Sequence, residues 1–385
     1  MISIIYILIL KLMQEATNMR VICSKDNLIE GINIVQKAVS TKTTLPILEG
    51  ILLEATSEFK LTGNDLEIGI ECIVQGDIQR EGNIVLNSKM FGDIVRRLPD
   101  SEVLIEVREN NLVIIECENS HFELKGLPAI GFPALPTIIK ENTFHISQKL
   151  VRDMIKQTLF AISTDENRPI LTGSFIECKS RELAFVSIDG FRLALRKNSI
   201  ENDVADFSIV IPGKTLNEIV KILQPIDENI IIYTSSNQVL FDIGKCKVVS
   251  RLLEGEYLNY RSIIPQDYET KVRVKTKDLL SSIERASLIT MEEKKYPVKF
   301  TISNDKIVIS SNTELGAVRE ELYVEMEGNK MEVGFNPRYF IDALRVIDEE
   351  NIEIFYTSCV GPCTIRSLEK DSFAYMILPI RIKND

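Results

Sequence analysis

Ser208-Ile-Val-Ile-Pro-Gly-Lys-Thr-Leu-Asn-Glu-Ile-Val-Lys-Ile-Leu223 is the stretch that decides the fold of this chain. Its β-branched run 209–211 favours a strand, which Pro212-Gly213 ends. Apolar residues then recur at the spacing i, i+3, i+4 and i+7, as on one buried face of a helix: Leu216, Ile219, Val220 and Leu223. The stretch therefore predicts a strand, a tight turn and a helix that exposes its lysines.

The same unit occurs three times at a nearly constant spacing. The three copies end at Leu98, Leu223 and Ile347, which stand 125 and 124 residues apart. A repeat of this length is a whole domain rather than one turn of a solenoid. Two runs with strand character follow each copy: 103–107 and 112–117, 230–233 and 239–243, and 352–356 and 363–367.

A second unit opens each third of the chain with a strand, a polar residue and a helix. The polar residues Ser24, Ser147 and Thr276 are predicted to be the helix N-caps. We therefore expect an α+β fold made of three copies of one domain, each with two helices packed on antiparallel sheets. The expected domains are 19–138, 139–265 and 266–385.

Residues 1–18 do not fit the repeat and are interpreted as an extension. They are either an upstream start or an added helix. The apolar run 2–10 is too short to cross a bilayer, which needs about 20 residues. A weak signal or anchor is the less favoured alternative, because a basic segment and a small-residue cleavage site are missing.

Composition narrows the class of protein and its compartment. The formal net charge of −11 argues against a protein that coats nucleic acid through its overall charge. The seven cysteines are odd in number, and no Cys-x-x-Cys occurs. We therefore expect reduced thiols and a cytoplasmic protein rather than a disulfide framework.

Positive charge is concentrated on the predicted helices. The six helical windows 24–38, 87–98, 147–160, 213–223, 275–287 and 336–347 together carry +7, which leaves −18 on the rest of the chain. A basic helical surface beside an acidic remainder favours helices that face an anionic partner. The alternative for any single residue is an ordinary solvated helix face.

Enzyme classes have little support in the sequence. The two histidines, His121 and His145, lie outside any metal-ligand spacing, and no phosphate-binding loop or nucleophile elbow occurs. Asp65 and Glu67 share a strand face and could hold a metal ion, although a solvated hairpin end is favoured. A carboxylate–metal hydrolase and a peptide-binding scaffold that does not bind DNA remain the alternatives.

Four motifs, in this order and on a threefold repeat, resemble one known family. They are Thr44-Leu-Pro-Ile-Leu48, Thr62-Gly-Asn-Asp-Leu-Glu67, Asp189-Gly-x-Arg-Leu193 and Leu378-Pro-Ile-Arg-Ile382. Together they resemble the β sliding clamp of bacterial DNA polymerase III over residues 19 to 382. The resemblance implies a non-catalytic head-to-tail homodimer that closes into a ring of six domains around double-stranded DNA, without reading its sequence. It implies neither a metal nor another cofactor.

The resemblance also implies helices that line the hole of the ring and partners that bind its surface. The residues expected to face DNA are Lys42, Lys89, Arg96, Arg97, Lys149, Arg152, Lys156, Arg168, Lys214, Lys221, Lys277, Arg338 and Arg345. The implied partners are the replicative polymerase α subunit, the clamp loader and other proteins with a clamp-binding motif. No membrane association is expected.

The partners are expected to insert a short peptide into an apolar pocket between the second and third domains. Its residues, by resemblance, are Leu171, Gly190, Phe191, Arg192, Leu193, Leu258, Ile263, Tyr339, Pro362, Met376, Leu378, Pro379, Ile380 and Arg381. Phe191 stands where the family often has His, Leu258 where Pro is usual, and Ser262 where Arg is common. The entrance of the pocket is therefore expected to differ in detail.

Ring closure needs complementary ends on each chain. Phe122 and Leu124 alternate on one face of the strand-like run 117–124, which would be a liability as an unpaired edge. Leu288 and Ile289 match apolar dimer-contact positions of the family. The four residues are predicted to form the dimer interface; the alternative is that they belong to the ordinary core.

Overall fold

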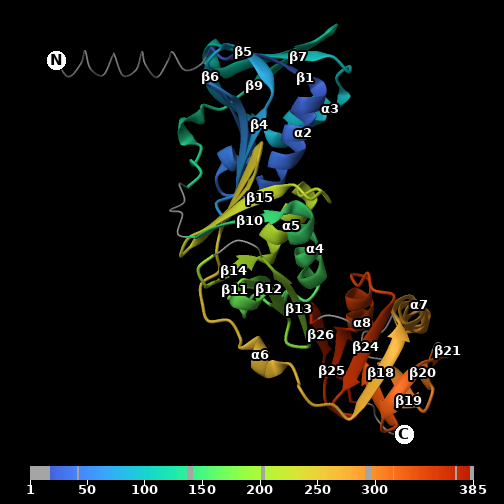
Figure 1. Cartoon of the computed structure of the whole chain (residues 1–385). Helices are drawn as coiled ribbons and strands as arrows, with labels where there is room; N and C mark the ends of the chain where they lie inside the picture. The colour runs from blue at the N-terminus through green and yellow to red at the C-terminus, as the bar shows by residue number, and fades with distance from the viewer. Residues whose placement is uncertain are drawn as a thin grey trace. The chain divides into compact units, whose positions relative to one another are not determined.

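The computed structural model describes residues 18–40, 43–136, 142–200, 204–290, 297–314, 316–368 and 371–381. The chain folds into two compact units (Figure 1). Unit 1 is Met1–His145 with Asn229–Arg251, and unit 2 is Ile146–Glu228 with Leu252–Asp385. The predicted extension 1–18 lies outside the described residues, apart from its last residue. No helix within the described ranges is long and apolar enough to cross a membrane.

Unit 1 packs two helices on antiparallel sheets. The helices are α2 (Lys25–Val35) and α3 (Ser88–Arg97). One sheet has the order β5-β1-β7-β8-β9, and the other has the order β10-β15-β16-β17-β4-β3-β2-β6. The strands are β1 (Arg20–Ser24), β2 (Gly50–Ala55), β3 (Phe59–Asn64), β4 (Ile68–Val74), β5 (Gly76–Arg80), β6 (Gly82–Asn87), β7 (Glu102–Arg108), β8 (Leu112–Cys117), β9 (Ser120–Lys125), β10 (Asn142–Ser147), β15 (Asn229–Thr234), β16 (Gln238–Ile243) and β17 (Cys246–Arg251).

Unit 2 contains α4 (Gln148–Leu159), α5 (Gly213–Ile222), α6 (Tyr260–Ile263), α7 (Thr276–Ser287) and α8 (Pro337–Leu344). Its sheets have the orders β14-β11-β12-β13-β26-β25-β24-β18-β22 and β21-β20-β19-β23. The strands are β11 (Gly173–Lys179), β12 (Glu182–Ile188), β13 (Arg192–Ser199), β14 (Phe207–Pro212), β18 (Thr270–Lys275), β19 (Val298–Ser303), β20 (Lys306–Thr313), β21 (Gly316–Tyr323), β22 (Glu325–Gly328), β23 (Met331–Phe335), β24 (Asn351–Tyr356), β25 (Cys363–Ser367) and β26 (Phe373–Ile377).

The predicted helix is confirmed at α5, with three of the four residues of the predicted stripe buried and Val220 half-buried. Leu216 and Ile219 are fully buried and Leu223 nearly so, while Lys214 and Lys221 are exposed. Burial of each such aliphatic side chain stabilises the fold by about 1.5–3 kcal/mol. Helices α3 and α8 repeat the arrangement, so the threefold α+β architecture follows from the periodicity.

Two of the three predicted N-caps are confirmed, and one is wrong. The hydroxyls of Ser24 and Ser147 accept hydrogen bonds from the amides of Asn27 and Leu150. Thr276 is instead the first residue of α7, and Lys275 precedes the helix without a side-chain cap. The Thr276 hydroxyl is buried and donates to the carbonyl of Glu349 at 2.6 Å, so a tertiary contact replaces the cap.

The repeat is also present in the strand register. The hairpins β3–β4, β12–β13 and β20–β21 pair Asn64 with Gly69, Ile188 with Leu193, and Asn312 with Ala317, each shifted by 124 residues from the last. The sheets continue across the repeat, because β4 pairs with β17 and β13 pairs with β26, both antiparallel. We call each of these two strand pairs a seam.

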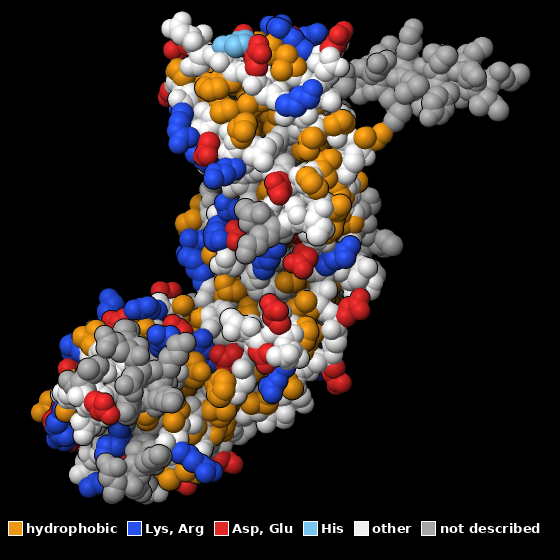
Figure 2. Space-filling view, turned by 180° about the vertical axis from the view of Figure 1, so that it is seen from behind, with side chains coloured by type: hydrophobic (Ala, Val, Ile, Leu, Met, Phe, Trp, Pro, Cys, Tyr) orange, Lys and Arg blue, Asp and Glu red, His pale blue; other side chains and the backbone are white. Residues whose placement is uncertain are grey.

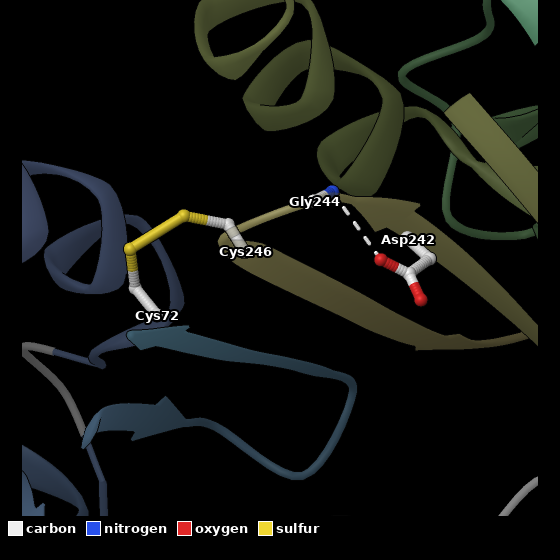
Figure 3. Close-up of a disulfide and its surroundings, with 4 residues drawn as sticks. All are labelled: Cys72, Asp242, Gly244 and Cys246. Carbon is white, nitrogen blue, oxygen red and sulfur yellow. Dashed lines mark hydrogen bonds between the residues drawn. A yellow bond between two sulfur atoms is a disulfide. The ribbon is translucent and has the colours of Figure 1, made fainter. Parts of the chain in front are cut away.

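The expectation that all cysteines are reduced is wrong for one pair. Cys72 of β4 and Cys246 of β17 form a disulfide (Figure 3). Cys23, Cys117, Cys178, Cys359 and Cys363 are free. The two bonded residues are 174 positions apart in sequence, and only the pairing of β4 with β17 brings them together. Spacing along the chain therefore could not predict this bond.

Candidate functional site

The apolar part of the predicted pocket is assembled in unit 2, where β13 meets β26. Leu193 pairs with Met376 across this seam, and the amide of Leu378 donates to the carbonyl of Phe191 at 2.9 Å. Leu171, Leu193, Met376, Leu378 and Ile263 belong to one apolar cluster. These predicted residues therefore share one wall, with Leu378 at its partly buried edge.

Arg192 fixes the polar side of the pocket. Its guanidinium bonds to Asp189 at 2.9 Å, to Asp342 of α8 at 2.7 Å and to the carbonyl of Phe160 at 2.6 Å. It also lies 4.6 Å from the ring centroid of Tyr339, within the range of a cation–π contact. With its side chain 12% exposed, Arg192 is a fixed donor at the rim rather than a mobile surface charge.

Phe191 forms the exposed part of the rim. Its ring is 59% exposed and stacks on Tyr339 at a centroid distance of 6.3 Å. Gly190 before it has a φ of +91°, a conformation that side chains rarely adopt. The turn thus presents the aromatic ring of Phe191 at the rim. Burial and Asp189 raise the pKa of Tyr339, so its hydroxyl stays protonated.

The remaining predicted pocket residues lie around this core to different extents. Ile380 is 40% exposed and its amide donates to the carbonyl of Gly334 at 2.8 Å. Leu258 and Arg381 are exposed, and Pro379 is half-buried. Pro362 lies in the loop before β25, where its carbonyl accepts a hydrogen bond from Thr357.

Two contacts near the predicted pocket residues were missed by sequence reasoning. Asp342 was treated as one charge of a helical window, yet it pairs with Arg192 across 150 residues. Glu177 accepts from Tyr260 and Arg261 at 3.0 and 2.6 Å, which ties α6 to β11. Burial tends to raise the pKa of Glu177, but these two donors outweigh it and hold the pKa below its usual range. No local sequence signal marks either contact.

The basic residues predicted to face DNA are mostly exposed. Lys89, Arg96, Arg97, Lys149, Lys156, Arg168, Lys214, Lys221, Lys277, Arg338 and Arg345 are exposed, and Arg152 is half-buried. Lys42 lies outside the described residues. Several are offset by carboxylates on the same or a neighbouring helix: Arg96 and Arg97 with Asp93, Lys221 with Glu218, and Arg345 with Glu284. The helical charge is therefore diffuse.

Two of the predicted interface residues, Phe122 and Leu124, lie in an edge strand, and the other two, Leu288 and Ile289, directly follow α7. β9 is an edge of its sheet, and Phe122 is 36% exposed there beside a hollow of about 390 Å³ that α3 lines with Met90, Ile94 and Arg97. Apolar side chains also gather on the surface of unit 1 in Figure 2. Leu124 and Ile289 are half-buried, while Leu288, directly after α7, is 69% exposed. β21 is an edge strand of the sheet with the order β21-β20-β19-β23.

Asp65 and Glu67 lie in a turn. The carboxylate of Asp65 accepts hydrogen bonds from the amides of Glu67 and Ile68 at 3.0 and 2.8 Å. Asp65 therefore closes the β3–β4 hairpin, as the favoured interpretation expects. In the part of the chain that the structure describes, no cluster of three or more potential metal ligands occurs.

Three domain families match consecutive parts of the chain. They are the N-terminal, central and C-terminal domains of the DNA polymerase III beta subunit, at residues 19–136, 145–259 and 261–381. Together they cover nearly the whole threefold repeat.

Curated relatives and solved structures agree with these matches. The beta sliding clamp of Bacillus subtilis is 38% identical over 376 residues, 94% of this chain and all of the relative, and that of Staphylococcus epidermidis is 36% identical over 93% of this chain and 98% of the relative. Crystal structures of a DNA polymerase III beta subunit from Eubacterium rectale and of the Bacillus subtilis clamp superpose with TM-scores of 0.92. They are 39% and 37% identical, and cover 94% and 95% of this chain and all of each structure. The chain belongs to the β sliding clamp family, the β subunits of DNA polymerase III.

Proposed function

We propose that two copies of this chain close head to tail into a ring that slides along double-stranded DNA without reading its sequence. The family is the non-catalytic clamp subunit of DNA polymerase III, so the protein acts by tethering rather than by chemistry. The observation that carries the proposal is the equivalence of the seams. The last strand of the second third, β17, pairs with β4 of the first third, and the last strand of the last third, β26, pairs with β13 of the second. The last strand of the first third, β9, is an edge strand of its sheet.

The last strand of the second third begins at Cys246 and that of the last third at Phe373. They pair with Cys72 and Arg196, two positions 124 residues apart. The next equivalent position is Glu320 of β21, an edge strand, and the last strand of the first third is β9, beginning at Ser120. We therefore expect β9 of one copy to pair with β21 of the other, with Ser120 opposite Glu320 and Phe122 opposite Val318.

Side-chain packing at the internal seam supports the same arrangement. Phe160 directly follows α4 and packs edge-on against Tyr375, the third residue of β26, at 5.5 Å. Leu288 directly follows α7, and Phe122 is the third residue of β9. We infer that Leu288 of one copy covers Phe122 of the other, with Ile289 and Leu124 beside them. This contact would bury side chains that are exposed in the single chain.

Such a head-to-tail contact closes once two copies supply six domains. The helices then carry the proposed DNA-facing residues, whose charge is partly offset by carboxylates. Because each firm phosphate contact adds salt-dependent affinity, a diffuse surface favours sliding, and the ring is retained by topology.

The apolar wall at Leu193, Met376 and Leu378 and the fixed guanidinium of Arg192 suit a short peptide with aliphatic side chains. We propose that the replicative polymerase α subunit, the clamp loader and other proteins with a clamp-binding motif dock there. We place the domain borders at 138–139 and 265–266, and the protein in the cytoplasm.

The proposal is tested by retention on circular and linear DNA. The protein is loaded by a clamp loader onto a nicked circle, which is then cut at one site. We expect stable retention on the circle and rapid loss after cutting, because a linear end lets the ring slide off. Equal retention on both forms would show binding by contact rather than by encirclement. Activity against phosphate esters that is lost in Asp65→Ala would instead support the hydrolase.

A further inference from the structure

We propose that Cys72 and Cys246 are a reversible dithiol–disulfide couple. When oxidised, this couple is a covalent staple, meaning a cross-link between the paired strands β4 and β17 of the seam. The two residues are directly opposed in the antiparallel ladder, with Cα atoms 4.2 Å apart. This distance is typical of the close, non-hydrogen-bonded pairs, whose side chains lie nearest to each other. The amide of Ile73 next to them donates to the carbonyl of Lys245 at 2.8 Å. The ladder itself therefore holds the two sulfurs in reach.

The turn before β17 fixes one end of the couple. Gly244 has a φ of +71°, and its amide donates to the Asp242 carboxylate at 3.3 Å (Figure 3). Cys246 follows as the first residue of β17. A positive φ favours glycine, so the turn places Cys246 without strain.

The staple joins strands that are far apart in the chain. β17 pairs with β16 on one side and with β4 on the other. Without the bond, backbone hydrogen bonds and packing alone hold this seam. With it, a loop of 174 residues is closed covalently, which restricts the unfolded chain. The staple does not depend on ring closure, so its test is separate from that of the proposed function.

The couple forms by exchange with a small disulfide such as oxidised glutathione. One cysteine thiolate attacks the small disulfide, forms a mixed disulfide and releases one thiolate. The second cysteine thiolate attacks the protein sulfur and releases the other. Two protein thiols are thereby oxidised, one small disulfide is reduced to two thiols, and the two cysteine protons pass to them.

Burial controls how the couple exchanges. Cys72 and Cys246 are 4% and 5% exposed, so a small thiol reaches them only when the seam opens. Cys359 is exposed in the loop after β24 and should react at once. Cys23 is buried, and burial raises its pKa to about 12, so it stays a protonated, unreactive thiol.

The first test counts thiols in the full chain after equilibration with glutathione, acid quenching and denaturation. We expect seven thiols in excess reduced glutathione and four in excess oxidised glutathione, because the exposed Cys359 also takes up one glutathione. In excess oxidised glutathione, Cys72→Ser should lose only the thiol of Cys359 and form no internal disulfide, whereas the control Cys359→Ser should still lose two thiols. Six thiols in wild type under excess oxidised glutathione, or a stable glutathione adduct on Cys72 or Cys246 in place of the internal bond, would overturn the proposal.

The second test measures what the bond does to the seam. We expect the oxidised protein to unfold about 5–10 °C higher than the reduced protein, with slower exchange of the β17 amides. Cys72→Ser with Cys246→Ser should abolish the dependence on redox state, while Cys359→Ser should keep it. Because oxidised and reduced wild type are compared directly, the test does not depend on the variants folding. Identical midpoints would overturn the role of the staple.

Discussion

Arg192 Nη1 lies 2.7 Å from Asp342 Oδ2, and this ion pair joins β13 to α8 beside the proposed peptide pocket. Arg192 is also bound by Asp189 on its own turn, so two carboxylates hold one guanidinium. The pair therefore couples the orientation of Arg192, at the rim of the proposed pocket, to α8. Asp342 contributes through Arg192 and is a positioning residue.

Asp342→Asn should weaken binding of a clamp-motif peptide by roughly 3- to 10-fold, because Arg192 loses one of its two carboxylate partners, a change on the order of 1 kcal/mol. Asp189 should keep the guanidinium near its place, so the melting temperature should change little. Fluorescence anisotropy with a labelled peptide measures the affinity. Asp348→Asn, on an exposed residue just beyond α8, is the matched control. Equal affinities of both variants and wild type would show that the ion pair does not position the rim.

Leu378→Ala with Ile380→Ala should abolish peptide binding and leave the oligomeric state unchanged. Leu378 is partly buried and Ile380 is 40% exposed, so their removal takes contacts from the proposed pocket more than from the core. Loss of two aliphatic contacts costs about 2–4 kcal/mol of binding free energy. Calorimetry and sedimentation on the same samples check both expectations. Unchanged affinity would move the pocket elsewhere.

A charge-reversal variant should copy a shorter length of DNA per loading event. It replaces four basic residues by Glu: Arg96, Arg97, Arg152 and Lys156. The helical surface then repels the phosphate backbone, and the effect should shrink as salt screens it. A matched control reverses Lys179, Lys245, Lys247 and Lys330, which are exposed outside the helices. If both sets behave alike in a primer-extension assay, the helices do not face DNA.

Periodicity was sufficient to predict helices α3, α5 and α8, because an apolar stripe such as Leu216, Ile219 and Leu223 is a local property of the sequence. Cap chemistry was sufficient at Ser24 and Ser147 for the same reason. Cap chemistry failed at Thr276, because its hydroxyl donates a hydrogen bond to the carbonyl of Glu349 in a distant loop. Local patterns cannot show such competition.

At the candidate site, too, local motifs were predictable and contacts between distant residues were not. The apolar wall around Leu193 and Met376 was predictable because β13 and β26 carry recognisable motifs. The Arg192–Asp342 pair and the Cys72–Cys246 bond were not, because each joins residues at least 150 positions apart that only strand pairing and helix packing bring together.

The pKa of His121 should lie above its ordinary value of 6.5, because Glu116 and Glu123 accept from its ring at 2.9 and 3.4 Å. A raised folded-state pKa means that the stabilisation of the β8–β9 hairpin is complete below pH 6.5. It is lost as the pH rises through the raised pKa. Proton NMR of the imidazole measures it, and Glu116→Gln should shift it down. The control Glu102→Gln should not.

The proposed register adds a second expectation for the same histidine. It places Arg319 of one copy opposite His121 of the other, so closure should lower the pKa of His121 relative to the open chain. The dimer should then weaken as the pH falls through that range. A titration of His121 that is identical in dimer and monomer would contradict this register.

Leu288→Ala with Ile289→Ala should give a folded monomer. Leu288 is 69% exposed in the single chain, so its loss removes little core packing, whereas the proposed contact with Phe122 is lost in both interfaces of the ring. The monomer should bind clamp-motif peptide as before, because the residues of that pocket lie within unit 2 of one chain. It should not remain on circular DNA. Sedimentation, circular dichroism and peptide binding on one preparation separate the outcomes. A persistent dimer would place the interface elsewhere, and an unfolded chain would assign these residues to the core. Val360→Ala, on another exposed apolar residue, is the matched control and should remain dimeric.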